Sequence, residues 1–83
     1  MWVELKNKQL INLDRITNLY IHITVEFSPS YVLVAKTESS KSEKEFVIFK
    51  SSDRKNTEEI LKRISIAISS NKNVFIVPDE SEL

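Results

Sequence analysis

The feature that most constrains the fold is a strict alternation of apolar and polar side chains between residues 19 and 27. Leucine, isoleucine, valine and phenylalanine occupy the odd positions, while tyrosine, histidine, threonine and glutamate occupy the even ones. Successive side chains of a β-strand point to opposite faces of a sheet, so this period of two is typical of a strand with one buried face. The pattern predicts a strand within residues 16–27 that ends at Ser28-Pro29-Ser30, because proline has no N–H to donate to a sheet.

Two shorter segments before this strand are predicted to form a hairpin. Residues 2–6 and 9–13 are rich in β-prone side chains, and Asn7 and Lys8 separate them. Asparagine is the non-glycine residue best suited to the positive φ that a two-residue hairpin turn requires. The two charged residues that follow interrupt the pattern, and we expect a bulge or a tight bend there.

Two continuous apolar runs come next, at residues 31–35 and 46–49. They predict a second hairpin with strands at 31–37 and 45–50, joined by a charged, solvated tip at residues 38–44. Neither run alternates, so both faces of these two strands are expected to be covered.

A helix of about 14 residues is predicted to begin at Asn56. Asn56 can cap the helix, and Glu59 can reach back in a capping-box arrangement. Asn71 stands in place of the glycine that often follows a helix. Residues 74–77 form a last strand that stops at Pro78. The apolar stripe of the helix is formed by Ile60, Leu61, Ile64, Ala67 and Ile68.

These elements define an α+β protein: an antiparallel β-meander of four to five strands, with the C-terminal helix packed on one face and a short terminal strand. The length suits one domain over residues 1–78, with the acidic residues 79–83 as a frayed tail. The expected core consists of Leu19, Ile21, Ile23, Val25, Leu33, Ile48, Ile60, Leu61, Ile64 and Ile68.

One short helix covers one face of a small sheet, which leaves the second face of the apolar hairpin without cover. Three arrangements would cover it: closure into a partial barrel, folding back of Trp2 and the terminal strand, or a second copy of the chain. Ile66 points away from the apolar stripe of the helix and the terminal strand needs a neighbour, so we expect a homodimer. The candidate interface residues are Ile66, Val74, Phe75, Ile76 and Val77.

Composition excludes several classes of function. Without glycine there is no phosphate-binding loop or nucleophile elbow, and without cysteine there is no disulfide framework or thiolate metal site. Twelve basic side chains balance twelve acidic ones, which argues against non-specific nucleic-acid binding. No apolar run approaches the roughly 18 residues needed to cross a membrane, and the first residues lack the pattern of a secretory signal. We therefore expect a cytoplasmic protein without a membrane span.

No residues are indicated for catalysis or metal binding. His22 is the only histidine, and it lies on the polar side of the long strand, where it is expected to face solvent. Glu58 and Glu59 are adjacent on the helix and therefore do not face each other as an acid–base pair. With one histidine and no nucleophile elbow, no serine is expected to be activated. The sequence predicts a protein that is not an enzyme and needs no cofactor.

The order of four strands followed by a helix resembles the single-stranded-DNA-binding fold of the PC4 coactivator and Whirly families. This resemblance in element order implies a helix-packed dimer whose strands face the nucleic acid. The neutral charge and the lack of a glycine- and lysine-rich segment depart from the PC4 pattern. The residues that would stack on bases or contact phosphates are Arg15, Tyr20, His22, Lys36 and Lys50.

A second resemblance is to short uncharacterised bacterial and phage proteins. It rests on an aromatic-led first strand, Trp2-Val3-Glu4-Leu5, and on the I-N-L-D segment at residues 11–14. This resemblance implies no residue roles. From the sequence we expect a small self-associating or protein-binding accessory module, with a dimeric single-stranded nucleic-acid-binding protein as the alternative.

Overall fold

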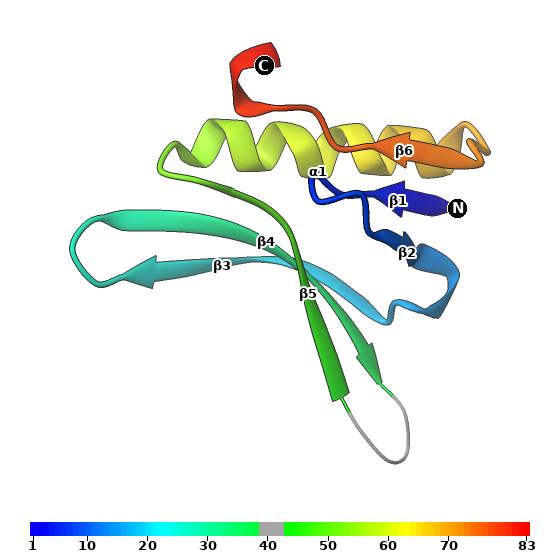
Figure 1. Cartoon of the computed structure of the whole chain (residues 1–83), viewed down its shortest axis with the longest axis horizontal. Helices are drawn as coiled ribbons and strands as arrows, with labels where there is room; N and C mark the ends of the chain where they lie inside the picture. The colour runs from blue at the N-terminus through cyan, green and yellow to red at the C-terminus, as the bar shows by residue number, and fades with distance from the viewer. Residues whose placement is uncertain (39–42) are drawn as a thin grey trace.

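The described residues, 1–38 and 43–83 of the computed structural model, form six strands in two open sheets and one α-helix (Figure 1). The elements are β1 (Trp2–Glu4), β2 (Leu10–Asn12), β3 (Asn18–Val25), β4 (Pro29–Glu38), β5 (Glu43–Ser51), α1 (Arg54–Ser69) and β6 (Val74–Ile76). The N-terminal sheet has the order β2-β1-β6, and the larger sheet has the order β3-β4-β5. The predicted α+β class is confirmed. The centre of the predicted charged tip, residues 39–42, lies outside the described part of the chain.

Two sheets form in place of one continuous meander because the chain bends between β2 and β3. The 3-10 helix η1 (Leu13–Arg15) takes the place of the expected bulge, and the Asn12 side chain caps it by accepting a hydrogen bond from the Asp14 N–H at 3.0 Å. β3, β4 and β5 pair antiparallel, whereas β1 pairs antiparallel with β2 and parallel with β6. The terminal strand therefore joins the N-terminal sheet, where the first and last strands of the chain lie side by side.

The turn of the N-terminal hairpin differs from the prediction. Positive φ falls on Lys8, at 69°, and not on Asn7. The Leu5 N–H donates to the Gln9 carbonyl at 2.9 Å, so the loop holds three residues and Lys8 takes the left-handed position that follows a type I turn. Asn7 supports the turn through its side chain, which accepts a hydrogen bond from the Gln9 N–H at 3.0 Å.

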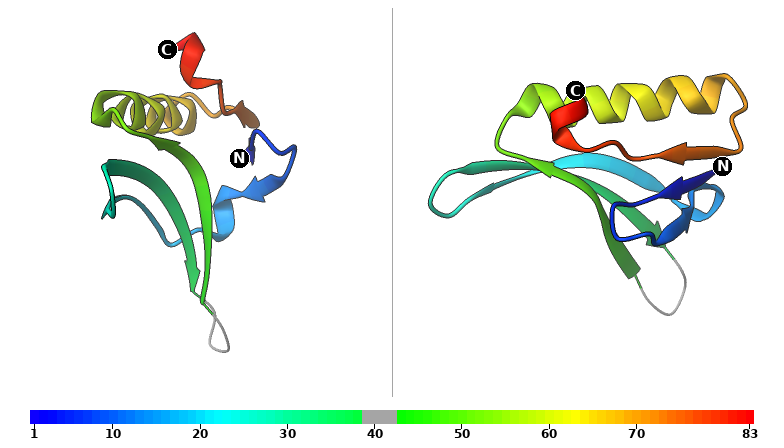
Figure 2. Two further views of the ribbon diagram at one scale, coloured as in Figure 1. Left: turned by 60° about the vertical axis from the view of Figure 1, so that its left-hand side comes forward. Right: turned by 45° about the horizontal axis from the view of Figure 1, so that its top comes forward.

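The core lies between the two sheets and α1. The helix packs on β4 and β5, and the N-terminal sheet lies beside it on one flank (Figure 2). The predicted core residues Leu33, Ile48, Ile60 and Ile64 are confirmed as buried, and Leu19, Ile21 and Leu61 pack against the core while partly exposed. The buried cluster consists of Val3, Leu5, Ile11, Leu33, Ala35, Ile48, Phe49, Ile60, Ile64 and Val77.

Three predicted core residues, Ile23, Val25 and Ile68, are exposed instead. Ile23 and Val25 lie on the expected side of β3, since the earlier odd-numbered residues of this strand pack against the core. The far half of β3 extends past the beginning of α1, which covers β4 and β5 (Figure 1). Ile68 lies at the margin of the helical stripe, beside a hollow that Met1 and Leu13 also line.

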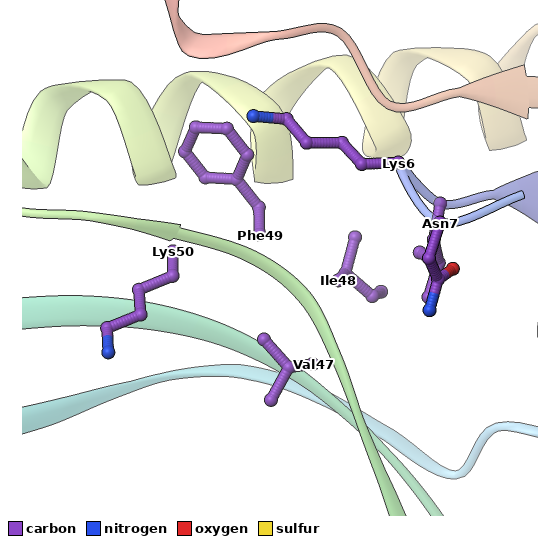
Figure 3. Close-up of a pocket in the computed structure, with 7 residues that line it drawn as sticks. Lys6, Asn7, Val47, Ile48, Phe49 and Lys50 are labelled. Carbon is purple, nitrogen blue, oxygen red and sulfur yellow. The ribbon is translucent and has the colours of Figure 1, made fainter. Parts of the chain in front are cut away.

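A β-bulge explains the continuous apolar run of β5. The register shifts between Leu33, which pairs with Phe49, and Val34, which pairs with Val47. Ile48 is therefore the extra residue, and Ile48 and Phe49 both point into the core while Val47 points outward (Figure 3). The expectation that both faces of this strand need cover is wrong, because the bulge turns two successive apolar side chains to the same side.

The helix is capped three residues earlier than predicted, by Asp53 and not by Asn56, and begins at Arg54. The Asp53 carboxylate accepts a hydrogen bond from the backbone N–H two residues on, at 3.0 Å. Glu59 does not form the capping box; its carboxylate pairs with the Arg63 guanidinium one turn on, at 3.1 Å. Asn71 has a φ of 56°, which confirms its predicted role just after the helix.

The acidic C-terminal residues fold against the beginning of the helix. Glu80, in the 3-10 helix η2 (Glu80–Glu82), accepts hydrogen bonds from the Ser51 hydroxyl and from the Asn56 side-chain amide, the latter at 2.9 Å. These two hydrogen bonds, that from Ser51 first, hold the pKa of the Glu80 carboxyl below its usual value. They connect Glu80 to the beginning of the helix, while residues 79–83 are all exposed. The fraying of this tail stays a prediction.

Candidate interaction surface

The outward side of the N-terminal sheet is largely apolar. In the register of β2-β1-β6, six side chains point away from the core in two rows: Asn12, Trp2 and Val74, then Leu10, Glu4 and Ile76. We call this surface the outer face. Its four apolar members are all about half exposed: Trp2 46%, Leu10 54%, Val74 52% and Ile76 64%. Contiguous exposed apolar side chains of this kind mark sites of interaction.

One carboxylate, that of Glu4, lies in the middle of the outer face between two apolar neighbours. Within the described part of the chain it forms no ion pair. A hollow of about 260 Å³ at this end of the outer face is also lined by Asp79, Glu82, Lys6 and Lys8. The Lys6 ammonium is already paired with the Asp79 carboxylate, at 3.1 Å. The charged groups beside the outer face are thus three carboxylates and two ammonium groups.

The structure separates the predicted interface residues of the terminal strand. Val74 and Ile76 belong to the outer face, whereas Phe75 packs against the core and Val77 is buried in it. The reason is the pleat of the strand, which sends alternate side chains to opposite faces. Only half of this predicted segment is therefore accessible to a partner.

Ile66, the remaining predicted interface residue, is exposed on α1. It lies two positions before Ile68, so the two side chains project about 160° apart around the helix. Ile68 lines a hollow together with Met1 of the N-terminal segment. Ile66 therefore points away from the N-terminal sheet and is not part of the outer face.

Sequence reasoning missed Trp2, Glu4 and Leu10 as members of this surface. β1 and β2 have three residues each, which is too short for an alternating pattern to be recognised. The only local signal is that Trp2 and Glu4 point to the side of the strand opposite to Val3. Which side faces outward depends on the pairing of β1 with β6, the first and last strands of the chain.

Four of the five predicted ligand-contacting residues lie on the side of the larger sheet that faces away from α1. Tyr20 and His22 of β3, Lys36 of β4 and Lys50 of β5 occupy register positions on this side, which we call the open face. His22 is exposed, as predicted. Arg15 belongs to η1 and has no position in either sheet.

The apolar residues of the open face are covered by side chains of the neighbouring strands. Val32 and Val34 of the central strand point to this side and are nevertheless buried. Val34 lies between Tyr20 and Val47 in the register, and the Tyr20 hydroxyl reaches across it to donate to the Glu45 carboxylate at 3.4 Å. None of the three arrangements expected from the sequence is needed to cover these valines.

A shallow hollow of about 320 Å³ separates the β1–β2 turn from β5 (Figure 3). The Lys6 amino group lies 5.9 Å from the centre of the Phe49 ring, while Lys50 points away from both. Among the described residues that line this hollow, the polar side chains are Lys6, Asn7 and Lys50. Because Lys6 is held by Asp79, the hollow presents no free pair of acidic and basic groups.

Two further observations concern the described residues as a whole. Within residues 1–38 and 43–83, no three histidine, cysteine, aspartate or glutamate side chains gather as metal ligands. In the same residues, no helix combines the length and the apolar character needed to cross a bilayer.

Comparison with known proteins finds no matching family model, no matching curated protein and no matching solved structure. Function must therefore be inferred from the surfaces of this chain.

Proposed function

We propose that this protein is a non-catalytic binding module that docks a basic amphipathic segment of a partner protein on its outer face. The observation that carries the proposal is the presence of four half-exposed apolar side chains among the six outward positions of one small sheet. Burial of such a surface against a partner is favourable because it removes apolar area from water. Trp2 supplies the type of large, rigid side chain that often contributes most to binding.

The Glu4 carboxylate decides the kind of partner. Two copies packed face to face on this surface would bring two Glu4 carboxylates into one apolar interface, where like charges are unfavourable. A lysine or arginine of a partner segment would instead pair with Glu4. The carboxylates of Glu4, Asp79 and Glu82 outnumber the ammonium groups of Lys6 and Lys8 by one at this end of the outer face, which favours the same sign of charge in the partner. An amphipathic helix with leucines along one side and basic residues at its margins has this chemistry.

The single tryptophan of the chain makes the test direct, because Trp2 lies in the outer face. The probe is a tryptophan-free amphipathic helical peptide of leucine and lysine, about 18 residues long. A matched peptide carries glutamate in place of every lysine. We expect the basic peptide to shift the Trp2 emission to shorter wavelength in a saturable way. We also expect it to bind about tenfold or more tightly than the acidic peptide, since one charge-assisted pair contributes this much.

Variants of the outer face supply the controls. Glu4→Lys should reverse the preference between the two peptides, and Ile76→Ser should weaken binding of the basic peptide about tenfold. Ile66→Ser removes a similarly exposed isoleucine outside the outer face and should leave binding unchanged. A preference for the basic peptide that survives Glu4→Lys would contradict the proposal, as would equal losses from the two serine variants.

A second candidate function is favoured by a separate observation, the grouping of Tyr20, His22 and Lys50 on the open face. As this alternative we propose binding of single-stranded nucleic acid, with bases stacking on Tyr20 and Lys50 contacting phosphate. A labelled oligothymidine of about 15 nucleotides should then lose affinity about fivefold per phosphate contact for each tenfold rise in salt. Tyr20→Ala should weaken binding tenfold or more, whereas Tyr31→Ala, beside Arg54, should not. Absence of binding at low salt would exclude this function.

A further inference from the structure

The free edge of β3 lacks the features that normally prevent strand pairing. Among the described residues β3 pairs with β4 alone, over eight consecutive residue pairs without a bulge. Monomeric proteins usually protect such an edge with lysine, proline, an inward-pointing charge or a bulge. β3 contains none of these, whereas β5, the other edge strand of the sheet, has a bulge at Ile48 and lysines at positions 44 and 50.

Exposed apolar side chains follow the same edge. The odd-numbered residues become steadily more exposed toward the β3–β4 turn, from Ile23 at 47% to Val25 at 72% and to Phe27, which is fully exposed. This end of the hairpin stands clear of α1 and of the N-terminal sheet (Figures 1 and 2). Both the backbone and the apolar side chains of this segment are therefore accessible to another strand.

We propose that two copies of the chain pair antiparallel along β3 and join their larger sheets into one six-stranded sheet. The two-fold axis of such a pair is perpendicular to the sheet, so residues directly opposite each other share a face. Odd-numbered residues therefore lie opposite odd-numbered ones, and even-numbered residues opposite even-numbered ones. A register centred on Ile23 pairs Ile23 with its copy and places Ile21 opposite Val25. The exposed apolar side chains of β3 then have apolar neighbours in the other copy, and Phe27, just past the end of the strand, comes near the Leu19 end of that copy.

The even-numbered residues are compatible with this register. His22 lies opposite Thr24, and β3 contains no acidic or lysine side chain, so no two like charges meet across the axis. The formal net charge of the chain is zero, which leaves no general repulsion between two copies.

The exposed area of the chain leaves room for a second copy. The accessible surface is 5839 Å², whereas a compact monomer of 9.6 kDa exposes about 5,100 Å². This excess of roughly 700 Å² is summed over the whole chain, and each partner buries about 800 Å² in an interface of standard size. The self-complementary pattern of β3 favours a second copy as the occupant of the edge, and the exposed area is compatible with it.

The first test is the mass of the protein by light scattering across a range of concentrations. The wild-type chain should form a dimer, and Ile23→Lys, which places two lysines opposite each other at the axis, should raise the dissociation constant about 100-fold or more. Val47→Lys changes a comparably exposed residue of the other edge strand and should remain dimeric. A wild-type monomer at every concentration, or an Ile23→Lys dimer as stable as the wild type, would overturn the proposal.

Cysteine variants test the register, because the chain has no cysteine of its own. Ile23→Cys places two thiols opposite each other, and a mild oxidant should join them in a disulfide between the copies. In Val25→Cys the two thiols are offset by four residues, about 14 Å, which is too far for a disulfide. Faster cross-linking of Val25→Cys than of Ile23→Cys would overturn this register.

The response of Trp2 to the basic peptide separates this proposal from the one for the outer face. Ile23→Lys should weaken the dimer and leave that fluorescence response unchanged, because β3 belongs to the larger sheet and Trp2 to the N-terminal one. Loss of the response together with the dimer would show that the two surfaces are not independent, which contradicts pairing along β3 alone.

Discussion

Replacing Leu33 with alanine should destabilise the protein by about 2–5 kcal/mol, the cost of a cavity in a packed core. Leu33 is fully buried in the middle of β4, with Ile21 and Phe49 beside it in the register. Because strands flank it on both sides and α1 packs on the same sheet, the surroundings have little freedom to collapse into the cavity. A domain of this size has a total stability of about 4–12 kcal/mol, so the variant should lose much of it.

Thermal and urea unfolding followed by circular dichroism would measure this loss, with an expected fall in Tm of about 10 °C or more. The matched control is Ile68→Ala, which truncates a half-exposed residue of α1 and should cost less than about 1 kcal/mol. Equal losses of stability in the two variants would contradict the position of the core described above.

Thr57→Val should lower the free energy of unfolding by about 1–3 kcal/mol, although the two side chains have nearly the same shape. Thr57 is fully buried in α1, and its hydroxyl donates a hydrogen bond to the Tyr31 carbonyl of β4 at 2.9 Å. Valine removes the donor and leaves the carbonyl oxygen beside a methyl group. The bond connects the helix to the central strand, so its loss weakens the contact on which the core depends.

The comparison with Thr57→Ser distinguishes the hydrogen bond from packing. Serine keeps the hydroxyl and loses one methyl group, so urea unfolding should show it to be more stable than the valine variant. If Thr57→Val were as stable as the wild type and Thr57→Ser were not, the methyl group and not the hydrogen bond would connect α1 to β4.

The strands and the helix could be predicted because their signals are local. The alternation at residues 19–27 identified β3, and the apolar stripe of the helix included Ile60 and Ile64, which are buried. The end of the helix could also be predicted, since Asn71 takes the left-handed conformation for which asparagine is suited. Side-chain direction repeats every 2 residues in a strand and every 3.6 in a helix, so a short window is enough to show it.

The errors arise where the position of one segment depends on another. Ile23 and Val25 follow the same alternation as Leu19 and Ile21 and are nevertheless exposed, because this half of β3 extends past the helix. The bulge at Ile48 depends on how β5 pairs with β4, and a continuous apolar run carries no sign of it.

The candidate surface was predicted in part. Val74 and Ile76 were identified from an apolar terminal segment that needed a neighbour, whereas Phe75 and Val77, predicted with them as interface residues, point toward the core. The same alternation that exposes two of these residues buries the other two. Trp2 and Glu4 could not be assigned to the surface at all, because more than 65 residues separate them from the strand beside which they lie.

The sequence by itself determined which segments are strands, where the helix lies and that the protein has an α+β fold. It did so because periodicity, caps and turn residues act over a few neighbouring positions. Only the tertiary structure decided that β1 lies beside β6, that α1 leaves the far half of β3 uncovered and that Trp2 shares a face with Val74. Exposure is set by contacts between segments that are distant in the chain, and no local period encodes those contacts.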